Sequence, residues 1–175
     1  LKLSPPHPLR LAPVVAYRAF LRGGGDLWGG GMRIADDRFS WVGWSADALI
    51  EHGSRPLSLG KVDIDSITLS GSLLVHRQWG AFAFRAGLGL RFGATRFQGT
   101  PDSPNLAEGK SVYSPWGWPM IVTGVSVQPL EPVVIELNLE SGYTVMPMGG
   151  LVGGTREITL NGVWMGGQLG IGVKL

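Results

Sequence analysis

The segment His52-Gly53-Ser54 carries the two residue types that nucleophilic hydrolysis needs most, a serine and a histidine two positions apart. A serine hydroxyl becomes a nucleophile when a histidine takes its proton and a third group orients that histidine. His52 and Ser54 fall just after a strand predicted to end at position 51, and neighbouring residues of a strand face opposite sides. Glu51, the adjacent carboxylate, would face the opposite side. His52 and Ser54 are therefore catalytic candidates without an identified orienting acid, and we do not expect an enzyme.

Five further charged residues occur singly, at alternate positions of otherwise apolar segments: Arg18, Arg85, Arg91, Glu136 and Glu140. Their chemistry would suit a proton path, a gate, an active site or an ion-pair network. An unpaired charge in a protein interior costs several kcal/mol, so charges that share an interior are expected to pair. We therefore expect these five residues to form a structural ion-pair network.

Metal, cofactor and nucleic-acid sites are not expected. The chain has no cysteine, and its histidines have no partner at metal-ligand spacing. The formal net charge is only +2, and Lys and Arg do not cluster among aromatic residues, which argues against a nucleic-acid partner. The segments 23–25 and 29–31 are glycine triplets, but they lack the lysine and the strand–helix context of a phosphate loop.

The elements that must position these residues are strands, because apolar and small or polar residues alternate along most of the chain. Phe82, Phe84, Leu88, Leu90 and Phe92 share one face of a segment whose other face carries arginine and glycine. Glycine is abundant, at 28 of 175 residues, and falls mainly on the polar faces. The pattern predicts eight strands, at 9–22, 27–36, 38–51, 60–77, 80–98, 116–128, 132–146 and 157–175.

The connections between these strands alternate in length. They are tight after the second, fourth and sixth strands and longer after the third, fifth and seventh, with the longest at 98–115. This alternation is typical of up-and-down barrels in an outer membrane, which have tight periplasmic turns and longer external loops. The predicted fold class is therefore all-β, a closed antiparallel transmembrane β-barrel of eight strands at 9–175, with a proline-rich lead at 1–8 and periplasmic termini.

A membrane barrel and a soluble barrel differ in which face of the strands, outer or inner, carries the apolar residues. An interior built from glycine, serine, arginine and glutamate would make a poor soluble core, whereas it suits a narrow polar lumen. The aromatic residues Trp28, Phe39, Trp41, Tyr113, Trp116, Trp118 and Tyr143 fall near predicted strand ends and are expected to form interfacial girdles. The apolar faces are thus expected to face lipid.

The last eight residues, QLGIGVKL, form an alternating strand that ends on an apolar residue. Gln168, Gly170, Val173 and Leu175 resemble the C-terminal signal by which the β-barrel assembly machinery recognises outer-membrane barrels, except that Leu175 stands where that signal usually has an aromatic residue. In strand number and loop alternation the chain resembles the small eight-stranded OmpA/OmpX-type barrels. That resemblance implies outer-membrane lipid, lipopolysaccharide and the assembly machinery as partners.

The favoured function is a structural or anchoring barrel with a filled polar lumen, whose external loops could bind a protein partner. Three alternatives remain: a narrow pore, a soluble lipocalin-like ligand-binding barrel, and a lipid A-modifying hydrolase. The third follows from a resemblance to eight-stranded lipid A deacylases, which carry a His-any-Ser pair near the outer leaflet. Arg55 replaces the asparagine that follows the serine in that family, and no acid follows at the family's spacing.

Overall fold

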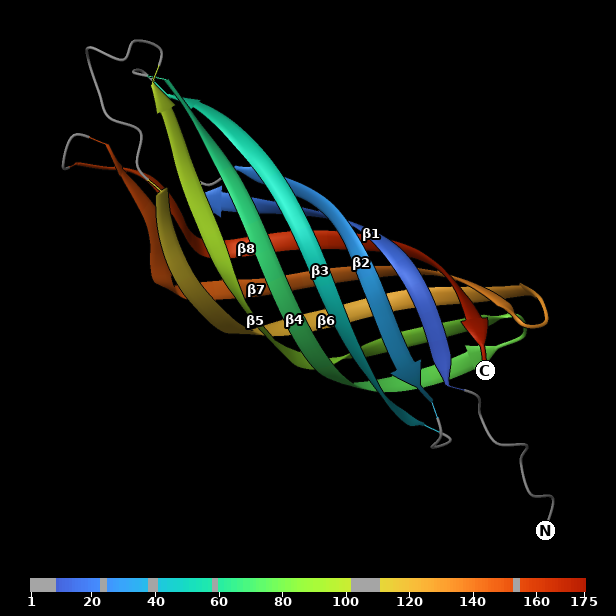
Figure 1. Cartoon of the computed structure of the whole chain (residues 1–175). Helices are drawn as coiled ribbons and strands as arrows, with labels where there is room; N and C mark the ends of the chain where they lie inside the picture. Colours follow the sequence, from blue (N-terminus) through green and yellow to red (C-terminus); the bar gives the residue numbers. More distant parts are fainter. Residues whose placement is uncertain (1–8, 23–24, 38–40, 58–59, 102–110, 153–154) are drawn as a thin grey trace.

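A computed structural model describes residues 9–22, 25–37, 41–57, 60–101, 111–152 and 155–175 of the chain. Each strand pairs antiparallel with the next, and the last pairs with the first, so the sheet closes into a barrel (Figure 1). The strands are β1 Arg10–Arg22, β2 Asp26–Asp36, β3 Val42–Leu57, β4 Gly60–Trp79, β5 Phe82–Pro101, β6 Ser111–Leu130, β7 Val133–Val152 and β8 Thr155–Lys174. The prediction of a closed eight-stranded antiparallel barrel is confirmed.

The stagger of the strands fixes the width of this barrel. Starting at Arg10 and following paired residues around the wall, the path passes Ala35, Ser45, Ser72, Gly89, Met120, Gly142 and Trp164 and returns to β1 at Phe20. The path therefore climbs from position 10 to position 20 in one circuit. With a rise of about 3.3 Å per residue and strands about 4.8 Å apart, this stagger tilts the strands by about 40°. An eight-stranded barrel of this kind has an interior that side chains can fill.

The two faces of the wall have opposite polarity, as expected for a membrane barrel. Phe84, Leu88 and Leu137 face outward and are 44–69% exposed, whereas Arg91 and Glu136 face the lumen and are at most 3% exposed. The outward apolar side chains form a continuous belt around the barrel, whereas the buried positions mix arginine, carboxylate, serine and apolar residues. The alternative of a soluble lipocalin-like barrel is therefore wrong, because its apolar residues would have to line the interior.

Several strands are longer than the alternation predicted. β3 continues past His52 to Leu57, so only 58–59 separate it from β4, and only 153–154 separate β7 from β8. β6 begins at Ser111 instead of position 116. The predicted external loops were too long because polar and glycine-rich residues were assigned to loops, although backbone pairing continues through them. The connection at 102–110 remains the longest between any two strands.

The two ends of the barrel differ in what they hold. The first and last strands meet with Arg10 paired to Lys174 at one end of the barrel, here called the terminal end (Figure 1). The Leu175 backbone N–H donates to the Leu9 carbonyl over 2.8 Å, so the last residue takes part in closing the barrel. The opposite end, here called the distal end, carries the connection at 102–110. The predicted lead at 1–8 lies outside the described residues.

The aromatic prediction was partly wrong. Trp28, Trp41, Tyr113 and Tyr143 face outward and are at least half exposed, whereas Trp116 is buried in the lumen and Trp118 packs against the buried apolar cluster. Phe39 lies outside the described residues. Pro115 and Pro119 occupy the exposed positions of β6, which turns the intervening tryptophans inward. The position of these tryptophans near a strand end did not show which face of the strand they occupy.

Candidate functional site

Two arginines and two carboxylates from four strands meet in the middle of the lumen. Arg91 Nη2 lies 2.8 Å from Glu140 Oε2 and 3.1 Å from Asp47 Oδ1. Arg33 Nη2 lies 3.2 Å from Asp47 Oδ2 and 3.5 Å from Glu140 Oε1. Each guanidinium thus contacts both carboxylates, and all four side chains are almost completely buried. We call these four residues the central square.

Neutral side chains complete the hydrogen bonding of the central square. Gln168 Nε2 donates to Glu140 Oε1 over 2.7 Å, while Arg33 donates to Gln168 Oε1 over 2.6 Å. Ser70 donates to Asp47 over 2.6 Å, and Arg91 donates to Thr68 over 3.0 Å. Buried charges are tolerated when they are paired and hydrogen-bonded in this way. The square and its partners tie together β2, β3, β4, β5, β7 and β8.

Ion pairs continue from the square toward the terminal end. Glu136 lies 3.7 Å from Arg33 and 3.3 Å from Arg85, so it links the two arginines. Arg85 also donates to Ser126 over 2.5 Å. Arg10 and Asp37 form a further pair at 2.8 Å. A cavity of about 260 Å³ adjoins this pair, lined by His76, Gln128 and Lys174 as well as by apolar residues such as Phe82 and Val134.

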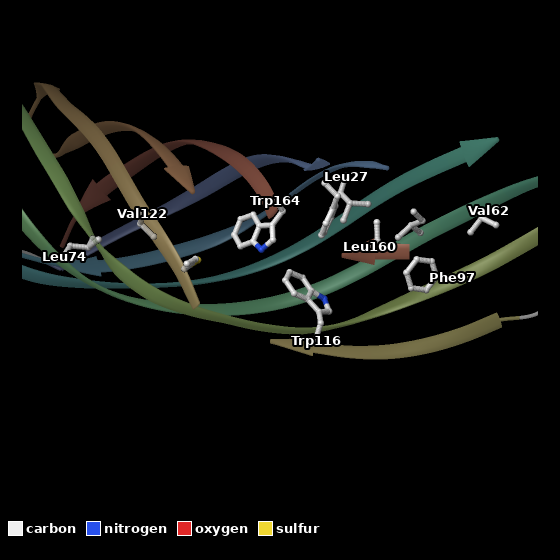
Figure 2. Packing of buried hydrophobic residues seen from close by; sticks show 11 residues of the cluster. Leu27, Val62, Leu74, Phe97, Trp116, Val122, Leu160 and Trp164 are labelled. Carbon is white, nitrogen blue, oxygen red and sulfur yellow. The ribbon is translucent and has the colours of Figure 1, made fainter. Parts of the chain in front are cut away.

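Most of the buried apolar residues lie on the distal side of the square, whereas Leu74 and Val122 lie toward the terminal end (Figure 2). Arg18 pairs with Glu51 at 3.1 Å, and its guanidinium carbon lies 5.1 Å from the Trp116 ring centre and 4.8 Å from that of Trp164. Cation–π contacts of this length stabilise a desolvated guanidinium. Figure 2 shows both indoles within the buried cluster, whose members are Phe20, Leu27, Val62, Ile64, Leu74, Phe97, Trp116, Met120, Val122, Leu160 and Trp164.

The structure brings the five charged residues singled out in the sequence into these networks. Arg91 pairs with Glu140, Arg85 pairs with Glu136, and Arg18 pairs with Glu51. Sequence reasoning missed Arg33, Asp47 and Glu51, as well as the Arg10–Asp37 pair. The signal was present for Arg33 and Asp47, since each is a charged residue between apolar or small neighbours in a strand, whereas Glu51 is followed by His52.

His52 and Ser54 both face outward near the distal end of β3, which continues through the segment predicted as a loop. No acid follows Ser54 at the spacing of the lipid A deacylases, but the fold supplies a carboxylate from the neighbouring strand: His52 Nδ1 lies 2.7 Å from Asp65 Oδ1 on β4. The pairing of β3 with β4 puts His52 directly opposite Asp65 and Ser54 opposite Asp63. The Ser54 side chain is hydrogen-bonded to Asp63, which also pairs with Lys61 at 3.1 Å.

The four residues of the C-terminal pattern have different surroundings. Gln168 is bonded within the lumen, whereas Val173 and Leu175 face outward in the apolar belt. Gly170 lies where β8 meets β1, and a Cβ atom there would come within 2.9 Å of Val14 Cγ1. A small residue at this position therefore allows the last and first strands to close the barrel.

No metal centre is formed by the described residues, in which His, Asp and Glu do not gather in groups of three or more. The described part of the chain also contains no helix that is long and apolar enough to cross a membrane. The ion pairs described above neutralise five lumen arginines with five carboxylates. The lumen is thereby filled with fixed, compensated charge.

A transmembrane β-barrel of eight strands with an ion-paired lumen is the class that this fold and this site define. Among solved structures, the chain is similar to the outer membrane protein OprG of Pseudomonas aeruginosa, with a TM-score of 0.65 and 14% identity over 97% of this chain and 96% of that one. It is similar to a major outer membrane protein of Thermus thermophilus, with a TM-score of 0.64 and 12% identity over 97% of this chain and 100% of that one.

A third similar structure is Ail, the attachment invasion locus protein of Yersinia pestis, with a TM-score of 0.57 and 13% identity over 96% of this chain and 97% of that one. No protein-family model matches the chain, and no curated protein matches it in sequence. At these identities the likeness concerns the fold, which is that of the small outer-membrane barrels.

Proposed function

We propose that this protein is a bacterial outer-membrane barrel that serves as a closed anchor, with its terminal end in the periplasm and its distal end outside the cell. The observation that carries the proposal is the central square. Arg33, Asp47, Arg91 and Glu140 contact one another across the lumen at 2.8–3.5 Å. A lumen crossed by compensated charges favours a plug over a conducting pore.

The same proposal covers the partners. The outward belt would contact membrane lipid, and lipopolysaccharide would surround the distal half. Insertion would use the β-barrel assembly machinery, with Gln168, Gly170, Val173 and Leu175 as the recognised pattern. The connection at 102–110 is the longest segment available for a protein partner outside the cell.

Planar-bilayer recording tests the plug. The purified protein should show no unitary conductance, whereas Arg91→Ala combined with Glu140→Ala should produce measurable conductance because it removes two members of the square. The control is Arg77→Ala combined with Glu131→Ala, which removes two exposed charges near the terminal end. Steady conductance from the unmodified protein would contradict the closed-anchor proposal and favour the pore.

Epitope accessibility on intact cells tests the orientation. A tag inserted at 102–110 should bind antibody on whole cells, whereas a tag beside Glu131, in the β6–β7 turn, should bind only after the outer membrane is permeabilised. The opposite pattern would show that the terminal end faces outward.

A second candidate function is a lipid-modifying hydrolase, which the His52–Asp65 contact of 2.7 Å favours. Asp65 accepting from Nδ1–H leaves Nε2 of His52 as the base, which is the arrangement that a serine nucleophile uses. Rotation of the Ser54 side chain away from Asp63 would bring its hydroxyl to that base. The hydroxyl oxygen would then attack an ester carbonyl as His52 takes its proton. The ester C–O bond would break, the alcohol would leave with the proton from His52, and water would hydrolyse the acyl-serine to a fatty acid and free Ser54.

An alkyl fluorophosphonate tests this candidate, since it labels only an activated serine. Labelling should disappear in Ser54→Ala and in His52→Ala and persist in Ser111→Ala, whose serine is also exposed near the distal end. Lipid A from expressing cells should lose the mass of an acyl group. The absence of both labelling and mass loss would leave the anchor as the only function.

A further inference from the structure

The barrel wall has one seam where backbone pairing stops early. β6 and β7 pair from Leu130↔Val133 up to Met120↔Gly142, and in the described residues no pair joins them beyond that point. Both strands nevertheless continue: β6 pairs with β5 up to Ser111, and β7 pairs with β8 up to Val152. We call the facing stretches, Ser111–Pro119 and Tyr143–Val152, the β6–β7 seam.

Proline explains why the ladder stops. Residues of a strand direct their backbone groups alternately to one neighbour and then the other. The Gln128 N–H donates to the Ala81 carbonyl beside β5 over 3.1 Å, so even-numbered positions of β6 face β5. Pro115 and Pro119 therefore occupy positions that face β7, where each lacks the N–H that a ladder needs. A third proline, Pro147, lies in the facing stretch of β7.

The seam opens within the apolar belt. On β6, Ile121 lies just below it and Tyr113 lies near its top, and both face outward. Tyr113 is paired with Arg96 of β5, the first charged outward residue on that strand beyond Phe92. Open strand edges are avoided in hydrocarbon because each unsatisfied backbone group costs several kcal/mol. An unpaired seam at this depth, with prolines that reduce the number of free donors, is a costly feature that calls for a function.

Directly behind the seam lies the tryptophan pair of the distal lumen. A Cβ atom on Gly142, the last paired residue of β7, would come within 2.6 Å of Trp164 Cζ2, so this indole packs against the wall where pairing ends. Trp116 projects inward from the seam stretch of β6 and faces Trp164 in the interior (Figure 2). The seam therefore separates the surrounding leaflet from an aromatic, apolar interior by a single layer of chain.

Polar donors without partners are buried at the same place. The indole nitrogens of Trp116 and Trp164, the hydroxyl of Thr144, and Nε and Nη1 of Arg18 have no hydrogen-bond partner among the described residues. A buried donor that lacks an acceptor costs about 1–3 kcal/mol. These donors surround the inner side of the seam and would be satisfied by a carboxylate or an ester carbonyl.

We propose that the β6–β7 seam is a lateral entrance for the acyl chain of a single-chain amphiphile, which would pass from the leaflet to the Trp116–Trp164 pair. The chain would displace or separate the indoles, and its carboxylate or ester carbonyl would accept hydrogen bonds from the unpartnered donors. A peptide strand is a poor occupant, because Pro115 and Pro119 remove donors on the β6 edge that strand addition needs. Hydrocarbon requires no such donors.

Photo-crosslinking tests the entrance in lipid vesicles. The probes are palmitic acid and lysophosphatidylcholine, each with a diazirine near the end of its acyl chain, and adducts are mapped by mass spectrometry. We expect adducts on Trp116 and Trp164, inside the barrel. Adducts with only one of the two probes would identify the free acid or the lysolipid as the ligand.

A disulfide across the seam provides the decisive comparison, since the chain has no cysteine of its own. Oxidised Pro119→Cys/Tyr143→Cys should lose the interior adducts, and reduction should restore them. The matched control is Leu88→Cys/Ile121→Cys, an outward pair across the fully paired β5–β6 wall, whose oxidation should change nothing. Trp164→Ala, which vacates volume behind the seam, should increase adducts on Trp116.

Each outcome decides the proposal. Adducts confined to outward-facing residues, or interior adducts that persist when the seam is oxidised, would overturn it. If the cysteine pair does not give a heat-modifiable, folded band, Pro115→Ala/Pro119→Ala replaces it. That variant supplies the missing donors to the seam and should reduce interior adducts, and unchanged adducts there would also overturn the proposal.

Discussion

Replacing Glu140 by glutamine removes one charge from the central square while keeping the shape of the side chain. In the protein, Glu140 contacts Arg91 at 2.8 Å and Arg33 at 3.5 Å and accepts from Gln168 at 2.7 Å. Glu140→Gln leaves the guanidinium groups of Arg33 and Arg91 sharing the carboxylate of Asp47, with Glu136 at 3.7 Å from Arg33 as the next nearest carboxylate. The lumen then carries an uncompensated positive charge with little access to water.

The expected loss of stability depends on the contacts that Arg91 keeps in the variant. Breaking a buried ion pair by removing one partner costs about 3–5 kcal/mol. Arg91 keeps its contact with Asp47 at 3.1 Å and its hydrogen bond to Thr68 at 3.0 Å, and the glutamine oxygen can still accept one hydrogen bond. We therefore expect Glu140→Gln to lower the free energy of unfolding by about 2–3 kcal/mol, at or below the lower end of that range.

Equilibrium unfolding in urea from lipid vesicles measures this loss, with the gel mobility shift of the folded barrel as the readout. The midpoint should fall while the slope of the transition stays constant, because the area exposed on unfolding does not change. The control is Glu131→Gln in the exposed β6–β7 turn, which should change stability by less than about 0.5 kcal/mol.

A Glu140→Gln variant whose unfolding free energy lies within about 0.5 kcal/mol of the unmodified protein would refute the reasoning. That result would mean that water or rearranged side chains compensate the charge left by the loss of the Glu140 carboxylate. A double-mutant cycle with Arg91→Met gives an independent check, since directly contacting buried residues should show a coupling of about 0.5–3 kcal/mol.

Three further outcomes follow from the same structure. Leu88→Arg puts a charge in the middle of the apolar belt and should cost about 2–4 kcal/mol in the same unfolding assay, whereas a loss below about 1 kcal/mol would mean that Leu88 does not face lipid. Gly142→Ala forces a methyl group within 2.6 Å of Trp164 Cζ2 and should cost about 1–3 kcal/mol, with a change in tryptophan fluorescence; unaltered fluorescence would argue against that contact. Glu51→Gln leaves Arg18 with a neutral glutamine oxygen and the two indole rings and should cost about 3 kcal/mol, which an unchanged urea midpoint would contradict.

Alternation in the sequence was sufficient to predict the number of strands and, along their central parts, the direction in which the side chains point. Period-2 patterning is a local property, because successive residues of a strand face opposite sides. Phe84 and Leu88 therefore had to face one way and Arg85 and Arg91 the other. The glycine-rich, charge-bearing face could fill only a narrow interior, which decided between a membrane barrel and a soluble one.

Strand ends were less predictable than strand faces. The segments after His52 and before Trp116 read as loops because they contain proline, glycine and polar residues. In the structure they remain strands, since pairing with a neighbour satisfies their backbone groups whatever their side chains are. A partner strand is a tertiary feature that no local pattern encodes.

Only the tertiary structure decided which charges meet. Arg33 and Glu140 are far apart in the sequence, and Asp65 faces His52 because β3 and β4 pair in one particular register. The same register determines that Pro115 and Pro119 lie on the edge facing β7, where the wall is left unpaired. Alternation in the sequence determines which face of the wall a residue occupies. The stagger of the closed barrel determines which residues of other strands lie beside it, and that stagger is fixed only when β8 pairs with β1.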